Sequence, residues 1–427
     1  MNPRTANGGR RGRRTAFVLV VLAAFASGAC ASSSAVPAGS AGSSRAAADD
    51  APRLIVLRPD ELARARALVA AKDSSVMPAF EELLDEARDA LGAPVIAVTQ
   101  KRTLLPPSND PHDYFSLSPY WWPDPSKPDG LPYIRRDGET NPESKRDLDQ
   151  PRVAAMGRRV RTLALAWYLT RDEAYAEGAA RQLRAWFLDP ATRMNPHLRF
   201  AQLVRGIDRE RGSGIIDTRW FIEAVDAAAL LEPSAAWTPE DAAALRAWMR
   251  EYLTWLRTSP NGAHEQRARN NHGSWFAAQT AALALYAGDF SLAREIVEGA
   301  RPRIGAQIRP DGTQPIELER TRSFHYAGFN LEALTRLAEI GRKVGVDLWT
   351  YEAPEDGSLR RAIDHVARYL PTPAEWPGRQ INALELENFL AVLSRAQAAY
   401  GDAAYADVLS RLPAGEVRRN VYTLIYP

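Results

Sequence analysis

A chain of 427 residues is long enough for one large folded unit or for two or three of average size. Hydrophobic residues make up 45% and charged residues 25%, which excludes a wholly disordered or fibrous chain. Lysine and arginine number 54 against 52 aspartate and glutamate, so a formal net charge of +2 gives no overall positive field that would mark a nucleic-acid-binding protein. Any anion-binding site must therefore be local.

Residues 1–30 have the order of a secretion signal. A basic stretch, Arg10 to Arg14, precedes an apolar run from Ala16 to Phe25 that is too short to span a bilayer. Small residues then lead to Cys30, the only cysteine, as in a bacterial lipobox. We expect Cys30 to be lipidated and the protein to be exported as a periplasmic or cell-surface lipoprotein, anchored in the outer membrane by its lipid alone. The alternative is ordinary signal cleavage and secretion.

Residues 31–50 are small, polar and aperiodic, which predicts a flexible tether to a folded domain over residues 51–427. Beyond Pro59 the apolar residues repeat at helical spacing, and strand-like patterns are confined to short runs such as 54–57 and 94–99. Helices are expected at 60–71, 74–91, 152–170, 172–187, 238–257, 270–287, 290–300, 328–343, 358–370 and 386–400.

The helix expected at 238–257 has the clearest signals. Thr238 and Asp241 form a variant of the capping box, Pro239 follows at the first helical position, and an apolar stripe runs from Leu245 to Leu256. About ten or more helices with short connections and no fixed-period repeat indicate a mainly α fold, a single closed or incomplete (α/α) toroid of antiparallel hairpins. We expect the long irregular segments 101–150 and 188–217 to line its cleft.

Three short segments carry chemistry. Tyr120, Trp121 and Trp122 offer flat apolar faces that suit sugar rings, although a buried Trp pair could equally anchor its loop. Asn270, Asn271 and His272 stand at a helix start, where an Asn cap and the helix N-terminus favour an anion. The third segment holds four polar side chains within seven residues of one another, Arg320, Arg322, His325 and Tyr326.

These segments together resemble the alginate lyase family of (α/α)-toroid polysaccharide lyases, between about residues 95 and 345. The matching motifs are His-Asp-Tyr at 112–114, Tyr-Trp-Trp-Pro-Asp-Pro at 120–125, Asn-Asn-His-Gly-Ser-Trp at 270–275 and Glu-Arg-Thr-Arg-Ser-Phe-His-Tyr at 319–326. Asn195-Pro196-His197 and the run 214–217 also match.

The resemblance implies cleavage of a uronate-containing polysaccharide by β-elimination, with mannuronate-rich alginate as the first expectation and glucuronan as the second. Asn271, His272 and Arg320 would bind the uronate carboxylate and stabilise the enolate-like intermediate. Tyr326 would serve as base and acid, or as acid with His272 as the base, and Arg320 is favoured over Arg322 for the charge role. Further sugar contacts are expected from Tyr120, Trp121, Trp122, Asn195, His197, Gln202, Asn270, Arg322 and His325, with loop capping as the alternative for Asn195, His197 and Gln202.

Two rival functions remain. A glycoside hydrolase on the same fold would use carboxylates such as Asp113, Glu317 and Glu319. A surface glycan-binding lipoprotein would keep the cleft without turnover. The six histidines show no HExxH or similar pairing and no Asp-rich loop occurs, so we expect no metal and no cofactor. We expect a monomer whose partner is an acidic polysaccharide and not a nucleic acid.

Overall fold

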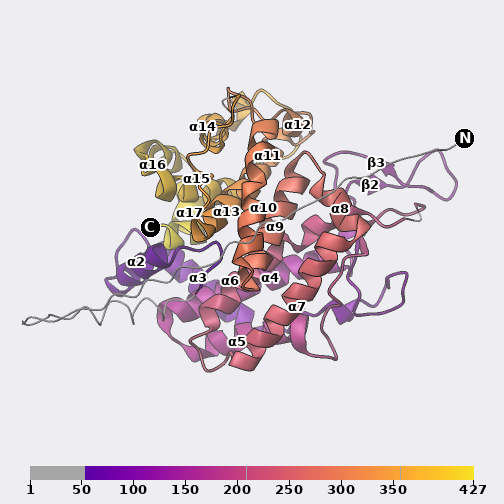
Figure 1. Ribbon diagram of the computed structural model, residues 1–427, viewed down its shortest axis with the longest axis horizontal. Helices are drawn as coiled ribbons and strands as arrows, with labels where there is room; N and C mark the ends of the chain where they lie inside the picture. The colour runs from indigo at the N-terminus through magenta and orange to yellow at the C-terminus, as the bar shows by residue number, and fades with distance from the viewer. Residues whose placement is uncertain (1–52, 208, 356) are drawn as a thin grey trace, which may run out of the picture. The chain divides into compact units, whose positions relative to one another are not determined.

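The computed structural model describes residues 53–207, 209–355 and 357–427, and it shows the mainly helical (α/α) toroid that the sequence predicts (Figure 1). The expected signal peptide, Cys30 and the tether lie outside the described residues. Within those ranges no helix is both long enough and apolar enough to cross a membrane.

Five strongly buried helices form the inner ring, and each packs on the next: α4 (Asp149–Thr170), α6 (Phe221–Leu231), α9 (Asn271–Tyr286), α13 (Ser323–Val344) and α15 (Glu387–Tyr400). The longer helices around them are α2 (Pro59–Ala70), α3 (Met77–Gly92), α5 (Glu173–Leu183), α7 (Pro239–Thr258), α10 (Phe290–Glu298), α14 (Leu359–Tyr369) and α16 (Ala403–Ser410). Short helices are α8 (Pro260–Gln266), α11 (Ala300–Gln307), α12 (Pro315–Leu318), α17 (Ala414–Arg418) and α18 (Val421–Ile425). Single turns and short 3₁₀ or π segments are η1 (Val98–Gln100), η2 (Pro142–Lys145), η3 (Arg184–Leu188), η4 (Gly212–Trp220) and η5 (Pro373–Glu375).

The outer helix α7 begins as its sequence predicts. Thr238 accepts a hydrogen bond from the amide of Asp241, whose side chain in turn accepts one from the amide of Thr238, and this completes the capping box. The predicted stripe of Leu245, Trp248 and their neighbours is buried against the inner ring. An amphipathic helix of this kind covers the toroid from outside because one face can remain in water.

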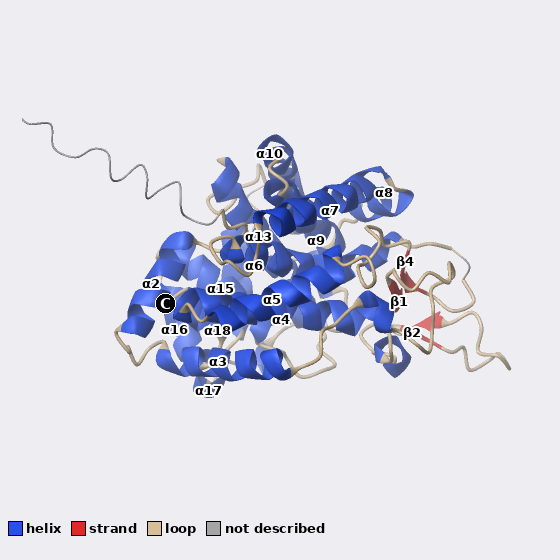
Figure 2. Cartoon of the chain, turned by 90° about the horizontal axis from the view of Figure 1, so that it is seen from below, coloured by secondary structure: helices blue, strands red, loops and turns tan. Residues whose placement is uncertain are grey.

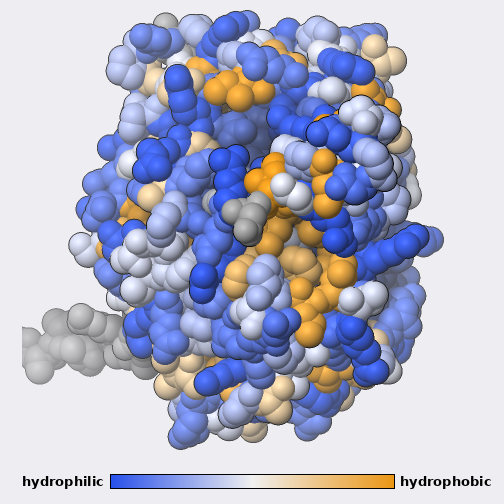
Figure 3. All heavy atoms as spheres, turned by 90° about the vertical axis from the view of Figure 1, so that its right-hand side faces the viewer, coloured by the Kyte–Doolittle hydropathy of each residue, from blue (hydrophilic) through white to orange (hydrophobic). Residues whose placement is uncertain are grey.

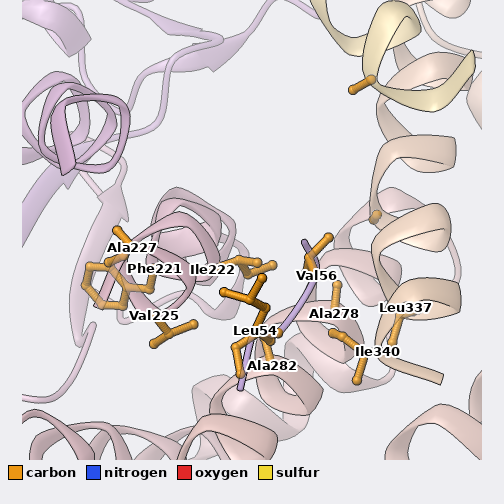
Figure 4. Packing of buried hydrophobic residues seen from close by; sticks show 14 of the residues in the cluster. Leu54, Val56, Phe221, Ile222, Val225, Ala227, Ala278, Ala282, Leu337 and Ile340 are labelled. Carbon is orange, nitrogen blue, oxygen red and sulfur yellow. The ribbon is translucent and has the colours of Figure 1, made fainter. Parts of the chain in front are cut away.

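The inner helix α6 was not among the predicted helices, because all 11 of its residues are buried and its apolar residues show no periodic stripe. Figure 4 shows its Ile222 beside Leu54 in the core, with Phe221 and Val225 of the same helix turned away from them. A helix buried on every side has no polar face to reveal its period.

The strand-like run 54–57 is not a strand. The amides of Ile55 and Val56 donate to the carboxylate of Asp226 on α6, at 2.6 and 3.0 Å, in place of a neighbouring strand. The run 94–99 is likewise not a strand, and its end enters the 3₁₀ turn η1.

The strands lie instead in the long irregular segments. β1 (Phe115–Leu117) pairs in parallel with β4 (Phe200–Leu203), and β2 (Trp121–Trp122) pairs antiparallel with β3 (Ile134–Arg135). Figure 2 shows β1, β2 and β4 gathered at one end of the helical body. These small sheets fix two segments that contain too many prolines and glycines to form long helices.

Replacing Asp226 by alanine is expected to lower the free energy of unfolding by about 3 kcal/mol, because the buried amides of Ile55 and Val56 lose their acceptor. Denaturant unfolding followed by circular dichroism measures the change. Asp226→Asn keeps one acceptor oxygen and is expected to lose less. Equal stability of Asp226→Ala and the parent would show that these amides find another partner.

Candidate active site

A cleft of about 640 Å³ opens where the N-terminal ends of α9 and α13 meet the irregular segments 117–150 and 202–220. Of the segments 101–150 and 188–217 that were expected to line a cleft, the parts from Leu117 and from Gln202 onward do so. Figure 3 shows the side of the molecule that carries β2, β3 and α8, where a strip of apolar side chains lies within a mostly hydrophilic surface. The volume lies within the range that small-molecule and cofactor sites occupy in proteins.

The charges on the cleft wall are mainly positive. The basic side chains are Arg135, Lys145, Arg158, Arg161, Arg211, Arg219, Arg320, Arg322 and Arg336. The acidic ones are Asp217, Glu223, Glu332, Glu385 and Glu387. An excess of this size in a chain of net charge +2 makes the cleft a local site for an anionic ligand.

Tyr326 lies in the first turn of α13 and points its hydroxyl toward a second tyrosine. Its hydroxyl donates to that of Tyr120 at 2.7 Å, and the guanidinium carbon of Arg320 lies 3.6 Å from the centre of its ring. Burial raises the pKa of Tyr326 well above its ordinary value and Tyr120 raises it further, whereas Arg320 lowers it in part. The proton on Tyr326 is therefore held at neutral pH, and any phenolate that forms is a strong base beside a cation.

Arg320 is fixed in this position by a carboxylate from the irregular segment. Its Nε and Nη2 donate to Oδ1 of Asp137 at 3.0 and 2.7 Å, and Asp137 also accepts from the amide of Thr321 at 3.0 Å. These partners hold the pKa of Asp137 far below its usual range, against the effect of burial. Gly138 follows at φ +79°, where a Cβ would lie 2.3 Å from Oγ1 of Thr321, so this close approach requires glycine.

The start of α9 presents the Asn-Asn-His motif. Asn270 caps the helix by accepting from the amide of His272 at 3.2 Å, as predicted. Asn271 is fully buried, and both its amide and its Nδ2 donate to the carboxylate of Glu317, at 2.6 and 2.8 Å. One Nδ2 hydrogen of Asn271 therefore remains for a ligand.

His272 is oriented by a buried carboxylate on α8. Its Nδ1 lies 2.6 Å from Oε1 of Glu265, which is 1% exposed, so Nε2 is the ring nitrogen left to face the cleft. Burial alone lowers the pKa of His272, but Glu265 and, more weakly, Glu317 outweigh it and the net shift is upward. The pair favours an imidazolium that can donate to an anion.

Six of the nine residues expected to contact sugar line the cleft: Tyr120, Trp121, Gln202, Asn270, Arg322 and His325. The four expected catalytic residues, Asn271, His272, Arg320 and Tyr326, line it with them. Gln202 adopts φ +49° in the left-handed region, and its Nε2 donates to Asp217 at 2.8 Å. His325 stacks on Phe329.

Trp122, Asn195 and His197 do not belong to the cleft wall. The indole of Trp122 donates to the carbonyl of Glu139 at 2.9 Å, so of the Trp pair one ring faces the cleft and the other anchors the loop. Nδ2 of Asn195 and Nε2 of His197 both contact the Asp113 carboxylate, at 2.7 and 3.1 Å. These contacts favour the alternative of loop capping over the predicted sugar contact for Asn195 and His197.

Three carboxylates that hold the site, Asp137, Glu265 and Glu317, were not assigned to it from the sequence. Glu317 was considered only as a possible hydrolase acid, but neither it nor Asp113 nor Glu319 lines the cleft. Among the residues that the structure describes, no three His, Cys, Asp or Glu side chains come together as metal ligands would.

Comparison with known proteins agrees with the fold. The model of the alginate lyase family matches residues 97–376. The structure of an alginate lyase from Bacteroides ovatus is 37% identical, covers 88% of this chain and 99% of its own, and superposes with a TM-score of 0.83.

A tetrasaccharide complex of a variant of alginate lyase A1-III, a protein known from Sphingomonas species A1, is only 16% identical. It covers 83% of this chain and 89% of its own with a TM-score of 0.55, and so supports the fold alone. A search of curated proteins gives no match. The family match spans well over half of the chain, and the chain therefore belongs to the alginate lyase family and is a polysaccharide lyase.

Proposed function

We propose that this lyase cleaves mannuronate-rich alginate by β-elimination and leaves 4,5-unsaturated uronate ends. The observation that carries the proposal is the contact of Arg320 with the face of Tyr326 beside Asn271 and His272, in a cleft with a positive wall. In this proposal Tyr326 carries the proton, and Asn271, His272 and Arg320 neutralise the carboxylate of the uronate. Alginate is also the substrate named for the relative from Bacteroides ovatus.

The first task of the site is to make the C5 proton of a uronate removable. The carbanion that forms next to the carboxylate is stable enough to form only when its charge spreads onto that carboxylate and the carboxylate is neutralised. Asn271, the imidazolium of His272 and Nη1 of Arg320, which has no hydrogen bond to the residues that the structure describes, supply positive charge and donors for that purpose. They act as an oxyanion hole does for an ester.

Tyr326 then moves one proton. Its phenolate, favoured by Arg320, takes the proton from C5, and the electron pair left behind forms the C4=C5 double bond as the C4–O bond breaks. The departing oxygen takes the same proton from Tyr326, which returns to phenolate. Because burial raises the pKa of Tyr326, the phenolate is scarce at neutral pH but strongly basic, which suits a weak carbon acid.

Replacing Glu265 by glutamine tests the role of His272. The carboxylate of Glu265 raises the pKa of His272, so its loss lowers that pKa. If His272 acts as an imidazolium, the alkaline limb of the pH profile of kcat/KM is expected to move to lower pH. A shift of the acidic limb to lower pH would instead make His272 the base. Oligouronate kinetics at a series of pH values, with Glu319→Gln as an exposed control, measure the shift.

The substrate is tested by ultraviolet absorbance of the domain from residue 53 onward with polymannuronate, polyguluronate, glucuronan and hyaluronan. A rise from the conjugated double bond, largest on polymannuronate, is expected. New reducing ends without absorbance would indicate hydrolysis, and binding without either signal would indicate a glycan-binding protein. If the largest rise occurs on glucuronan, the reaction is still β-elimination, but the substrate is glucuronan and not alginate.

We also propose that the protein is exported and anchored through a lipid on Cys30. The order of basic, apolar and small residues before that single cysteine supports the proposal. Labelling with a palmitate analogue in a bacterial host is expected to mark the parent protein and not Cys30→Ser. Label on both proteins would rule out Cys30 as the lipid site.

A further inference from the structure

Arg219, like Arg158 and Arg211, is an arginine of the cleft wall without an ion pair to a described residue, and it is the one of the three that lies against the ring of Phe329 on α13. Arg336 pairs with Glu223 at 2.6 Å and with Glu332 at 2.9 Å, so its charge is already balanced. Arg219, by contrast, has no carboxylate within 4.0 Å in the described ranges, and its only side-chain hydrogen bond there is to the carbonyl of Ile216 at 3.3 Å. The guanidinium has five N–H donors, most of which remain unused.

The surroundings of Arg219 are aromatic. Its guanidinium carbon lies 5.1 Å from the ring centre of Trp220, 5.2 Å from that of Phe329 and 6.0 Å from that of Trp275. Burial lowers the pKa of Arg219, because it holds this charge away from water, and the carboxylates of Glu332 and Asp217, which do not pair with it directly, offset the shift only in part. Aromatic faces hold the guanidinium flat and offset part of that cost, but they accept few of its hydrogen bonds. No described carboxylate pairs directly with Arg219, so its free N–H donors can bind an anionic group of a ligand.

The position of Arg219 relative to Tyr326 defines which part of the ligand it meets. Phe329 lies one turn along α13 from Tyr326, with their ring centres 6.5 Å apart, and Arg219 contacts the ring of Phe329. His325 stacks on Phe329 at 5.8 Å, and burial together with Arg322, Arg219 and Arg320 lowers its pKa to about 3. His325 is therefore neutral and does not compete with Arg219 for an anion.

We propose that Arg219 binds the carboxylate of the uronate unit next to the one that reacts at Tyr326. This inference rests on the proposed function and adds a requirement to it, because the substrate must then carry uronates on adjacent units. Homopolymeric uronates meet the requirement. Alternating polymers of a uronate and a neutral hexosamine do not, and the guanidinium would remain without its partner when such a chain binds.

The test compares two oligouronates that differ at one carboxyl group: one is complete, and in the other only the unit next to the reacting uronate is reduced to the neutral hexose. The parent protein is expected to lose about 10- to 100-fold in kcat/KM on the reduced oligosaccharide, mainly through KM. Arg219→Ala is expected to show the same kcat/KM on both, and Arg219→Lys to keep part of the difference. Because each protein is compared with itself on the two oligosaccharides, any general loss of activity in a variant cancels. The remaining difference reports the contact between Arg219 and the carboxylate.

Arg171→Ala is the matched control, because Arg171 also lies over an indole, that of Trp167 at 4.5 Å, but outside the cleft. It is expected to discriminate between the two oligosaccharides as the parent does. If Arg219→Ala does not fold, the test is made with Arg219→Lys, which is expected to discriminate between the two oligosaccharides less than the parent does. Equal discrimination by the parent and the Arg219 variants overturns the role of Arg219 alone. A parent protein without elimination on the complete oligouronate overturns the proposed function as well.

Discussion

Replacing Tyr326 by phenylalanine is expected to lower kcat for elimination by about 10³-fold or more while KM changes little. The variant keeps the ring under Arg320 and loses only the hydroxyl that carries the proton. The fold should persist, because the hydroxyl makes one hydrogen bond, to Tyr120. Ultraviolet absorbance with saturating polymannuronate measures kcat, and the melting temperature verifies the fold.

Tyr120→Phe is the matched control for that variant. It removes the same hydrogen bond from its other end but leaves the proton carrier in place, so we expect a loss of about 10-fold, well below that of Tyr326→Phe. Activity of Tyr326→Phe within about 10-fold of the parent would show that another group moves the proton, and His272 would then be the first candidate.

The helices were predictable where a polar face or a capping residue marks them in the sequence. α7, α9 and α14 lie within two residues of their predicted bounds, because caps such as Thr238 and Asn270 mark where they start. α6 escaped prediction because its burial is complete. The short strands escaped as well, since β1 and β4 pair across more than eighty residues and each contains only three or four residues.

In the site, too, the residues in local motifs were predictable, and the contacts that depend on the fold were not. Asn271, His272, Arg320 and Tyr326 lie in two short motifs, and the fold brings these motifs to one cleft. Of their partners, Asp137 and Glu265 come from other segments, and Glu317 lies two residues before the second motif. A single carboxylate is indistinguishable in sequence from a solvated surface charge. Only the fold shows that Glu265 is 1% exposed and directed at a histidine.

Replacing Arg320 by alanine is expected to lower kcat by about 10²- to 10³-fold, the second largest loss, because the cation beside Tyr326 and the carboxylate donor disappear together. Arg320→Lys is expected to recover little. A lysine has one charged nitrogen and cannot both pair with Asp137 as the Nε and Nη2 of arginine do and lie flat on the ring. Kinetics on polymannuronate, with kcat and KM resolved, measure the effect.

Arg322→Ala separates this role from that of a neighbouring charge. Arg322 also lines the cleft, but it pairs with the exposed Glu385 at 3.5 Å and makes no contact with the ring of Tyr326. We therefore expect a loss below about 10-fold, mainly in KM, as for a residue that contacts sugar or holds its loop. A larger fall in kcat for Arg322→Ala than for Arg320→Ala would show that Arg322, and not Arg320, stabilises the enolate. Arg320 would then act only through Asp137, as a positioning residue for the loop that carries Tyr120.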